Sequence, residues 1–465
     1  MSICNCLKSH RRWMVTISTC FVFAGVLAPM TVYGRLFIDI GSEIGTSAVQ
    51  TGWIASVTWA MCHLAGPLPE RMETYIGYRP VVIIGVSLTA LSIFTSSYMN
   101  SFPGLLLFYG FGYGTSVNLV LHAATCVLFK YFRDSKSTLA TGIAFSGSSA
   151  GTILLTVVYE KMVPLIGWRV MLRLTSLYCV IISIPCFFLT FKTDEGRKVS
   201  KDKRSMKRIL QGNNKKITEN SPDTSEAHFE ELRPGHCIAS DDVIQDEPVT
   251  NKANSTTWKK LLTDTLTWLF FFAVFLPAMA WSVFWINIVS FFESVNIKDL
   301  CILKLLTVQA VFELVGKLGV GFLAQLVPVI YVLICHNLLF LFVCIVLVFF
   351  PTYEVLLVAS ILIGTGRGTY NILPYSVATY VLPDDSSDKA VTIAMIALGL
   401  GFTFGTLPAG AIFDATGSYT YAFLVNTAWY AMGFVLLLFS TQVLYKKQTI
   451  VQTSQSHQPT LSHSV

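Results

Sequence analysis

The stretch "GFGYGT" at residues 110–115 recurs as "GTGRGT" at residues 364–369. Both copies read G-x-G-x-G-T, and each lies within a run of mainly apolar residues. A second pair of glycines, Gly167 and Gly417, is separated by 250 residues, against 254 for the first pair. Two pairs of matching positions at nearly one offset indicate that the chain consists of two related halves.

Twelve apolar runs contain and surround these repeated stretches. A helix that crosses a bilayer needs about 20 mainly apolar residues, and each run is close to that length or longer. The runs form two groups of six, separated by a polar interval. They lie near residues 13–33, 51–68, 80–98, 102–128, 138–158, 168–191, 266–291, 302–326, 329–350, 353–381, 389–413 and 419–444.

The composition agrees with a membrane protein and excludes an ordinary soluble domain. Of the 465 residues, 53% are hydrophobic and 13% are charged, whereas soluble domains are about 25% charged. The mean hydropathy is +0.60. Because two six-helix parallel repeats describe the major facilitator architecture, we predict an all-α polytopic membrane protein with about twelve transmembrane helices in two six-helix halves.

The predicted boundaries divide the chain into four parts. An N-terminal half covers 1–191 and a C-terminal half covers 265–445. The interval 192–264 is polar, begins with a basic run and lacks hydrophobic periodicity, which is typical of a largely disordered linker. The tail 446–465, "KKQTIVQTSQSHQPTLSHSV", is also predicted to be disordered.

Basic residues cluster in alternate connections and predict the orientation. They precede the first span, lie between the fourth and fifth, follow the sixth and follow the twelfth. With twelve spans these segments lie on one side, and the positive-inside rule makes that side cytoplasmic for both termini and the linker. The residues are Lys8, Arg11, Arg12, Lys130, Arg133, Lys136, Arg197, Lys198, Lys201, Lys203, Arg204, Lys207, Arg208, Lys446 and Lys447.

Three ordered stretches resemble the monocarboxylate transporter family of the major facilitator superfamily. "GPLPERMETYIGYRPVVIIG" (66–85) is similar to the family's G-P-L…G-x-R-P-V-V-I-x-G stretch. "KYFRDSKSTLATGIAFSGSSAG" (130–151) resembles a signature in which Tyr-Phe and a basic loop lead into L-A-x-G-x-A-x-x-G-S. "GTLPAGAIFDATGSYTYAFLV" (405–425) is similar to G-x-P-x-A-G-x-x-x-D-x-T-G-S-Y. The resemblance covers both halves but neither the linker nor the tail.

The resemblance implies positions for the functional side chains. Proton-coupled lactate carriers of this family have a substrate-contacting lysine in the first span. They also have an acidic residue and an arginine at i and i+4 in the eighth. Alignment on "YGRLFIDI" (33–40) puts Thr31 at the lysine position, while Glu313 and Lys317 occupy the other two. The charge pattern is kept but the residues differ, so the resemblance supports carboxylate transport as a class without naming the carboxylate.

Glu313 and Lys317 lie in the apolar run "VFELVGKLGVGFL" (311–323). Residues at i and i+4 share a helix face, and ionisable residues inside a membrane indicate a functional site. In the functional interpretation Glu313 exchanges a proton while Lys317 attracts a substrate carboxylate, so protonation of Glu313 releases Lys317. In the structural interpretation the pair is an ion pair that fixes this helix against a neighbour.

Two further residues are candidates for substrate contact. Arg367 lies in "GTGRGTYN", and its guanidinium suits bidentate binding of a carboxylate; a structural bond to carbonyls or to Glu313 is the alternative. Asn118 shares a helix face with His122 and is a candidate to line the cavity, although a lone histidine in a helix is usually only hydrogen-bonded.

We therefore predict a secondary or facilitative transporter of small monocarboxylates or related organic solutes that works by alternating access. Proton coupling is compatible with the sequence. The resemblance also includes carriers of amino acids, hormones or other amphipathic solutes without proton coupling. A transporter-like sensor or scaffold is the alternative from another class, but the plain linker does not argue for it.

The sequence shows no Walker A motif, catalytic triad or metal-ligand spacing, so we predict no enzymatic activity, no cofactor and no metal site. The eleven cysteines are interpreted as packing residues or free thiols. The expected partners are a small carboxylate or related solute, H+ and the lipid bilayer, not nucleic acid. The resemblance adds a single-span accessory protein and the plasma membrane as the location.

Overall fold

The computed structural model describes residues 2–33, 36–46, 48–132, 136–189, 258–295, 297–382, 387–416 and 419–456. Within these ranges the chain is helical and contains no strand. The linker interval 192–257, including its basic run, lies outside the described residues, as do Gly417 and the last nine residues.

The first half contains a long helix followed by shorter ones that lead into a second long helical segment. Its elements are α1 (Ser2–Val26), α2 (Ala28–Thr31), α3 (Phe37–Ile44), α4 (Ala48–Leu64), α5 (Pro67–Ile76), α6 (Tyr78–Ser96), α7 (Phe102–Leu105), the π-helix η2 (Leu106–Tyr113), α8 (Gly114–Tyr131) and α9 (Lys136–Leu189). In α9 the helix is interrupted at Gly167, whose φ of 76° is in the left-handed region that glycine tolerates.

The second half repeats this arrangement. Its elements are α11 (Trp258–Thr263), α12 (Thr265–Ile286), α13 (Ile288–Ser294), α14 (Asp299–Leu326), α15 (Val329–Phe349), α16 (Tyr353–Tyr370), α17 (Leu373–Val381), α18 (Ser387–Thr416) and α19 (Thr420–Ser456). The axes of α16 and α17 differ by 43°, with the break at Asn371–Ile372, so the pair forms one bent span.

The predicted fold class is confirmed. Among the described residues nine helices are long and apolar enough to cross a membrane, and the bent α16–α17 pair adds a tenth. One of the nine is α9, which Gly167 divides into two spans. Helix α4, with 17 residues, is slightly shorter than these spanning helices. All twelve apolar runs therefore correspond to helices.

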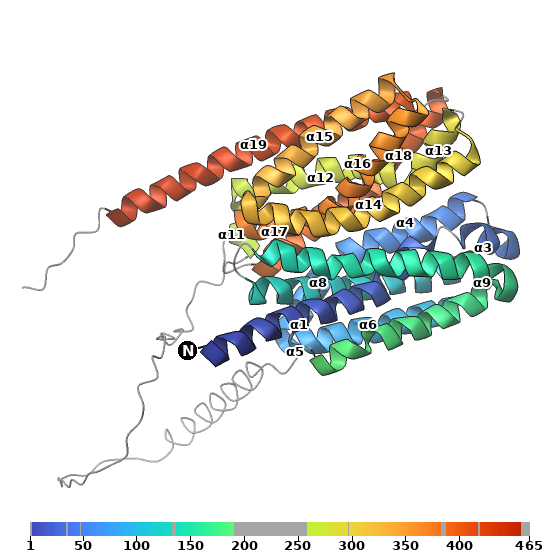
Figure 1. Cartoon of the computed structure of the whole chain (residues 1–465), viewed down its shortest axis with the longest axis horizontal. Helices are drawn as coiled ribbons and strands as arrows, with labels where there is room; N and C mark the ends of the chain where they lie inside the picture. Colours follow the sequence, from blue (N-terminus) through green and yellow to red (C-terminus); the bar gives the residue numbers. More distant parts are fainter. Residues whose placement is uncertain are drawn as a thin grey trace, which may run out of the picture. The chain divides into compact units, whose positions relative to one another are not determined.

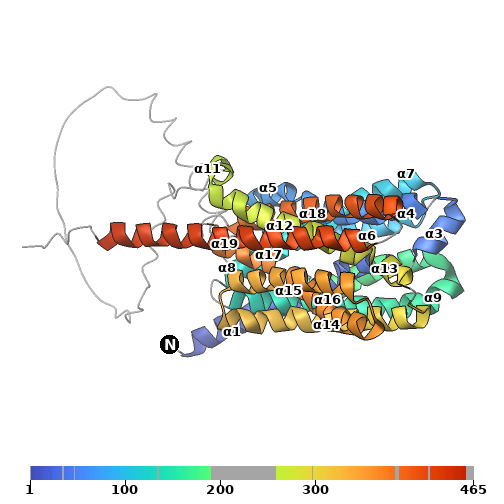
Figure 2. The ribbon, with the colours of Figure 1, turned by 90° about the horizontal axis from the view of Figure 1, so that it is seen from above.

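The two halves pack side by side as a helical bundle. In Figure 1 the blue-to-green first half lies below the yellow-to-red second half. Contacts between the halves come mainly from α14 against α9 and from α18 against α4. Figure 2 shows α5, α11 and the N-terminus at one end, here called the α5 end, and α3, α7 and α13 at the other, the α3 end.

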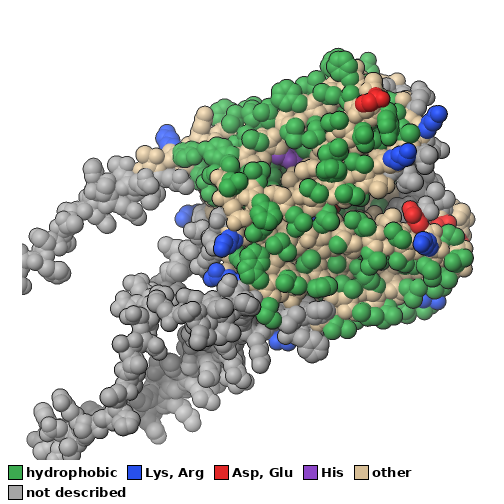
Figure 3. Space-filling model, viewed as in Figure 1, with side chains coloured by type: hydrophobic (Ala, Val, Ile, Leu, Met, Phe, Trp, Pro, Cys, Tyr) green, Lys and Arg blue, Asp and Glu red, His purple; other side chains and the backbone are tan. Residues whose placement is uncertain are grey.

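Apolar side chains cover the lateral surface, as a lipid-facing surface requires. Figure 3 shows hydrophobic side chains spread over the length of the bundle and charged side chains near its ends. Leu91, Leu107, Val358 and Phe439 are all more than half exposed. A soluble monomer rarely exposes apolar surface on this scale, which agrees with a multi-pass membrane protein.

Two predicted boundaries need correction. Residues 258–263, assigned to the linker, form α11. The tail was predicted to be disordered from residue 446, but α19 continues to Ser456. The segment "KKQTIVQTSQS" contains no glycine or proline, and its lysines and glutamines are good helix formers. The helix therefore continues beyond the apolar span, and Pro459 is the first helix-breaking residue after it.

The repeated glycine motifs hold equivalent helices together in the two halves. A Cβ added at Gly114 would lie 2.6 Å from the Thr58 carbonyl oxygen of α4, and one at Gly368 would overlap the Glu313 carbonyl oxygen of α14. Glycine therefore permits close approach of helix backbones in both copies. At the second variable position of the first copy, Tyr113 is fully buried and donates to the Val26 carbonyl at 2.8 Å.

At the α3 end, one ion pair joins α3 to α9. Arg169 Nε donates to Glu43 Oε1 at 2.8 Å, and Trp168 Nε1 donates to Glu43 Oε2 at 2.5 Å. Arg169 Nη1 also donates to the carbonyls of Ser97 and Met99 after α6. The hydrogen bond from Arg169 is the main reason that the pKa of Glu43 is lowered, with help from Trp168.

This lowered pKa predicts acid sensitivity. The pair's stabilisation is fully present above the ordinary glutamate pKa of about 4.3 and is lost as the pH falls through the lowered folded-state pKa. Because the Glu43 side chain is 49% exposed, we expect a contribution of at most about 1 kcal/mol. Melting temperatures of the wild type and Glu43→Gln in detergent should differ at pH 7, and the difference should shrink as the pH falls below about 4.3; a constant difference would contradict this.

Candidate functional site

The charged residues predicted from the sequence meet at the interface of the two halves. Glu313 lies on α14 between two cations, one on its own helix and one on α16. Its Oε1 accepts a hydrogen bond from Lys317 Nζ at 2.8 Å, and its Oε2 lies 3.6 Å from Arg367 Nε. The cluster therefore contains one carboxylate and two cations, and it carries one excess positive charge when all three groups are ionised.

Lys317 is the more tightly held cation. Its side chain is 2% exposed, and besides Glu313 its Nζ donates to Ser148 Oγ at 2.8 Å and to Ser149 Oγ at 2.7 Å. An ammonium group has three N–H donors, so all three are used. Both serines belong to α9 in the first half, and the bonds therefore tie the halves together at the level of the cluster.

Arg367 is held more loosely and faces aromatic residues. Its Nη1 donates to Gln309 Oε1 at 3.5 Å, a long hydrogen bond, and its guanidinium carbon lies 3.5 Å from the centre of the Trp285 ring. Trp285 in turn contacts Trp59 of the first half, with ring centroids 5.1 Å apart. The guanidinium has five N–H donors, and among the described residues only Gln309 accepts a hydrogen bond from it.

Close helix packing explains how the two cations come together. Cβ atoms added at Gly364 and Gly316 would overlap the backbone of Gln309 and Thr365 respectively, and one at Gly368 would come within 2.7 Å of the Lys317 amide nitrogen. The three glycines lie on the contact between α14 and α16. Because the glycines of "GTGRGT" have no side chains, α16 packs closely against α14, and Arg367 lies beside Glu313.

The remaining predicted site residues lie apart from the charges. Thr31 contacts the cluster only indirectly: its hydroxyl lies 2.6 Å from that of Thr152, which donates to the Ser148 carbonyl. Asn118 is fully buried, and its Nδ2 donates to the Cys62 carbonyl at 2.6 Å. It also lies 3.8 Å from the Met395 sulfur. The structure thus places Asn118 at a junction of α8, α4 and α18.

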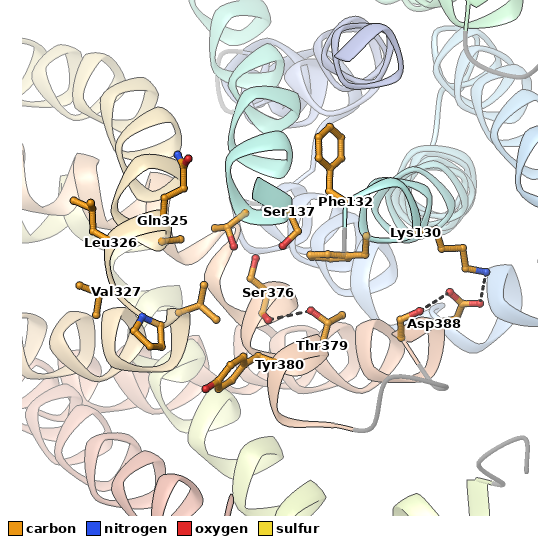
Figure 4. A pocket seen from close by; sticks show the side chains of 16 residues that line it. Lys130, Phe132, Ser137, Gln325, Leu326, Val327, Ser376, Thr379, Tyr380 and Asp388 are labelled. Carbon is orange, nitrogen blue, oxygen red and sulfur yellow. Dashed lines mark hydrogen bonds and ion pairs between the residues drawn. The ribbon is translucent and has the colours of Figure 1, made fainter. Parts of the chain in front are cut away.

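A cavity of about 970 Å³ opens at the α5 end. Figure 4 shows its wall, in which Lys130 and Ser137 of the first half face Gln325, Tyr380 and Asp388 of the second. The sequence-predicted site residues are absent from its lining. Ala324 in the cavity wall lies seven positions after Lys317 on α14, about two helical turns away.

Tight contacts between the halves separate this cavity from the charge cluster. A Cβ added at Gly321 would lie 2.6 Å from Leu139 Cα, and the rings of Phe145 and Tyr375 stack with centroids 6.1 Å apart. On the cavity side, Lys130 Nζ lies 3.2 Å from Asp388 Oδ2. Toward the α5 end, the two halves therefore contact each other at several points along the bundle.

A second buried cluster near the α5 end brings together three side chains of types that bind metal ions. The carboxylate of Glu73, the imidazole of His122 and the thiol of Cys126 have one ligand atom each within 4.8 Å of the others. All three residues are buried. His122 and Cys126 are four residues apart on α8, a spacing visible in the sequence, whereas Glu73 is brought in by the fold of α5.

The sequence analysis missed other members of the charge cluster. Ser148 and Ser149 lie in "GSSAG" (147–151), where a Cβ added at Gly151 would lie 2.8 Å from the Ala24 carbonyl oxygen. The packing role of the glycine is therefore supported, but the serines between the glycines hold Lys317. The signal available in the sequence was that these two small polar residues lie directly between the glycines of this motif.

Comparison with known proteins identifies relatives along most of the chain. A family model described as Major Facilitator Superfamily matches residues 14–300 and 270–457. Human monocarboxylate transporter 14 is 22% identical over 463 residues, covering 92% of this chain and 89% of that protein. Mouse monocarboxylate transporter 2 is 24% identical over 413 residues, covering 88% and 78%. The resemblance found in the sequence motifs is confirmed by these matches.

Solved structures show the same fold at low sequence identity. The proton:xylose symporter XylE bound to 6-bromo-6-deoxy-D-glucose superposes with a TM-score of 0.71 at 13% identity, covering 94% of this chain and 96% of that one. The E. coli fucose:proton symporter FucP gives a TM-score of 0.60 at 16% identity, covering 92% and 98%. At these identities the likeness concerns the fold alone.

Proposed function

Because the chain belongs to the Major Facilitator Superfamily, we propose that it is a secondary transporter that moves a small monocarboxylate or related organic anion by alternating access. The observation that carries this proposal is the cluster of Glu313 with Lys317 and Arg367 at the interface of the halves. Two cations with one carboxylate leave a positive charge that an anionic substrate neutralises. Relatives named monocarboxylate transporters support the same substrate class.

Arg367 is the proposed first contact for the substrate carboxylate. It keeps donors available, and its Glu313 and Gln309 partners are 3.6 and 3.5 Å away. A bidentate guanidinium–carboxylate pair is shorter and stronger than these contacts. The substrate carboxylate therefore competes well for Arg367, while the apolar part of the substrate faces Trp285 and Trp59.

Glu313 is the proposed coupling group. While it is ionised it holds one of the three donors of Lys317. Protonation removes that charge–charge attraction and leaves two cations at the interface of the halves with no internal anion. Proton uptake at Glu313 and anion binding at Lys317 and Arg367 then favour each other, and such reciprocity is what coupling between two sites requires.

A second substrate class is favoured by the aromatic side chains beside Arg367. Trp59 stacks on His63, and His63 contacts Phe402 of the second half. Together with Trp285 these residues provide apolar, flat surfaces next to a cation. An aromatic amino acid or another amphipathic solute with a carboxylate would use the same two features without requiring proton coupling.

The proposed orientation places both termini in the cytoplasm of a plasma-membrane protein. Among the described residues, Arg71, Arg79, Lys259 and Lys260 lie on elements at the α5 end. Lys130 also lies at this end, in the wall of the cavity. The positive-inside rule favours the cytoplasm for the end with the stronger basic bias. The cavity at the α5 end would then open toward the cytoplasm.

Uptake by proteoliposomes tests the proposal. The panel comprises labelled short-chain monocarboxylates, an aromatic amino acid and a neutral sugar, each with and without an inward proton gradient. We expect accumulation of at least one carboxylate and none of the sugar. Arg367→Gln should reduce carboxylate uptake at least tenfold, because the lost charge-assisted hydrogen bonds are worth about 1.5–3 kcal/mol.

Control measurements separate a binding defect from misfolding. Arg173→Gln removes a basic residue that stacks on Tyr98 at the α3 end and should leave uptake near the wild-type value. Absence of uptake for every carboxylate and the amino acid, with folded protein in the vesicles, would refute the proposed function. Equal loss of uptake and expression in Arg367→Gln would assign Arg367 a structural role.

A further inference from the structure

Glu73, His122 and Cys126 form a buried group near the α5 end, on the side of the bundle where α8 meets α18. His122 Nδ1 lies 2.8 Å from Glu73 Oε1, and its Nε2 lies 2.9 Å from the Thr392 hydroxyl of α18. The Cys126 sulfur lies 3.8 Å from His122 Nδ1. The charge cluster at Glu313 uses none of these residues, so this group needs its own explanation.

The three side chains are a donor set suited to zinc. Zn2+ is bound by imidazole nitrogen, thiolate sulfur and carboxylate oxygen, with metal–ligand distances of about 2.0–2.3 Å. Ligand atoms around one tetrahedral ion are therefore about 3.3–3.8 Å apart. The three ligand atoms here lie within 4.8 Å of one another, so small side-chain rotations bring them to this spacing. The i, i+4 spacing of His122 and Cys126 puts both on one face of α8.

A polar atom without a partner points to the same conclusion. Glu73 Oε2 is buried and makes no hydrogen bond to any described residue, and the Glu73 side chain is only 2% exposed. A buried carboxylate with an unsatisfied oxygen is costly. A cation bound by this carboxylate would satisfy that oxygen and compensate the charge.

The charges around the three side chains favour binding of a divalent cation. Asp388 adds another carboxylate close enough to influence Glu73 and Cys126 electrostatically. Lys130 is the basic neighbour on α8, but it lies against Tyr78 and pairs with Asp388 at 3.2 Å, and its side chain is 42% exposed. The buried part of the cluster is therefore rich in acidic groups and poor in cations.

We propose that Glu73, His122 and Cys126 form a binding site for Zn2+. A rotation of the Glu73 carboxylate away from His122 Nδ1 admits the ion between the three ligands. Coordination replaces the thiol proton of Cys126, which is released to the buffer, while Glu73 binds as a carboxylate and His122 as a neutral imidazole. Two ligand charges then balance the two charges of the ion, and a water molecule completes the coordination.

Metal binding at this site would strengthen the contact between the two halves at the α5 end. With the metal on Nδ1, the proton of the neutral imidazole is on Nε2, where it donates to the Thr392 hydroxyl of the second half. Metal-bound histidines commonly donate their second N–H to an oxygen in this way. Thr392 also donates to Glu70 Oε2 at 3.0 Å, so the metal strengthens a chain of hydrogen bonds from α5 and α8 to α18.

Zinc titration of the purified full-length chain in detergent, first stripped with a chelator, tests the proposal. We expect Zn2+ to raise the melting temperature in a saturable manner, because a ligand that binds only the folded state stabilises it. Cys126→Ala and His122→Gln should each weaken Zn2+ binding at least tenfold. Cys344→Ala, which removes a buried cysteine of α15, is the matched control and should bind as the wild type does.

Cobalt provides a readout that does not depend on stability. Co2+ in place of Zn2+ should give a thiolate charge-transfer band that is present in the wild type and in Cys344→Ala and absent in Cys126→Ala. Zinc affinity unchanged in both ligand variants, or a cobalt spectrum without a thiolate band, would overturn the proposal. Neither measurement requires a transported substrate, so the result is independent of the proposed transport function.

Discussion

Glu313→Gln is expected to lower the stability of the folded protein by about 3–5 kcal/mol, the usual cost of removing one partner from a buried ion pair. Glu313 is the only acidic residue for which an ion pair with Lys317 or Arg367 is found among the described residues. Its loss leaves two cations in a buried site. We also expect the dependence of uptake on an inward proton gradient to disappear, because glutamine cannot exchange a proton.

A double variant separates the two effects. Glu313→Gln combined with Lys317→Gln removes both charges of the tight pair and should recover a large part of the lost stability, as in a double-mutant cycle. It should not recover proton dependence. Thermal unfolding in detergent and uptake at several pH gradients are the measurements. Proton-driven uptake that persists in Glu313→Gln would show that another group couples transport to H+.

Gly368→Ala is expected to disrupt the site without changing any charge. The added Cβ would overlap the Glu313 carbonyl oxygen and lie 2.7 Å from the Lys317 amide nitrogen. Both are backbone atoms of α14, so no side-chain rotation relieves the overlap, and α16 must move away. Overpacking of this kind costs about 1–3 kcal/mol. Because Arg367 moves with α16, we expect a large loss of carboxylate uptake as well.

Gly319→Ala provides the matched control on α14. A Cβ at this position would have no atom within 4 Å outside the glycine's own surroundings. Alanine is favoured over glycine in a helix by about 1 kcal/mol, so this variant should be as stable as the wild type or more stable. Melting temperatures and uptake of the two variants give the comparison. Equal behaviour of Gly368→Ala and Gly319→Ala would contradict the proposed close contact of α14 with α16.

The helices and the main charge pair were predictable because their signals are local. A run of about 20 apolar residues is sufficient to predict a spanning helix, and the spacing of Glu313 and Lys317 is sufficient to predict that they meet. The G-x-G-x-G-T repeat also predicted the symmetric halves. The position of Arg367 beside Glu313 agrees with one of the alternatives drawn from the sequence, a bond between the two residues.

The partners from distant helices were not predictable from local patterns. Ser149 is 168 residues from Lys317 in the sequence, and Glu73 is 49 residues from His122. Such contacts depend on how the helices rotate and pack, which periodicity alone does not fix. Asn118 illustrates the same limit: its helix face was identified, but its contacts are with Cys62 and Met395 instead of the charge cluster.

The two glycine motifs share their backbone role but differ at the residue between the second and third glycines. In the first half, the hydroxyl of Tyr113 donates to the Val26 carbonyl, so this residue joins η2 to α1. In the second half, the partners of Arg367 among the described polar residues are Gln309, through one long hydrogen bond, and Glu313, through an ion pair. The repeat is therefore symmetric in backbone packing and asymmetric in chemistry: the first copy contributes a structural contact, and the second contributes the cation that the proposed function assigns to the substrate carboxylate.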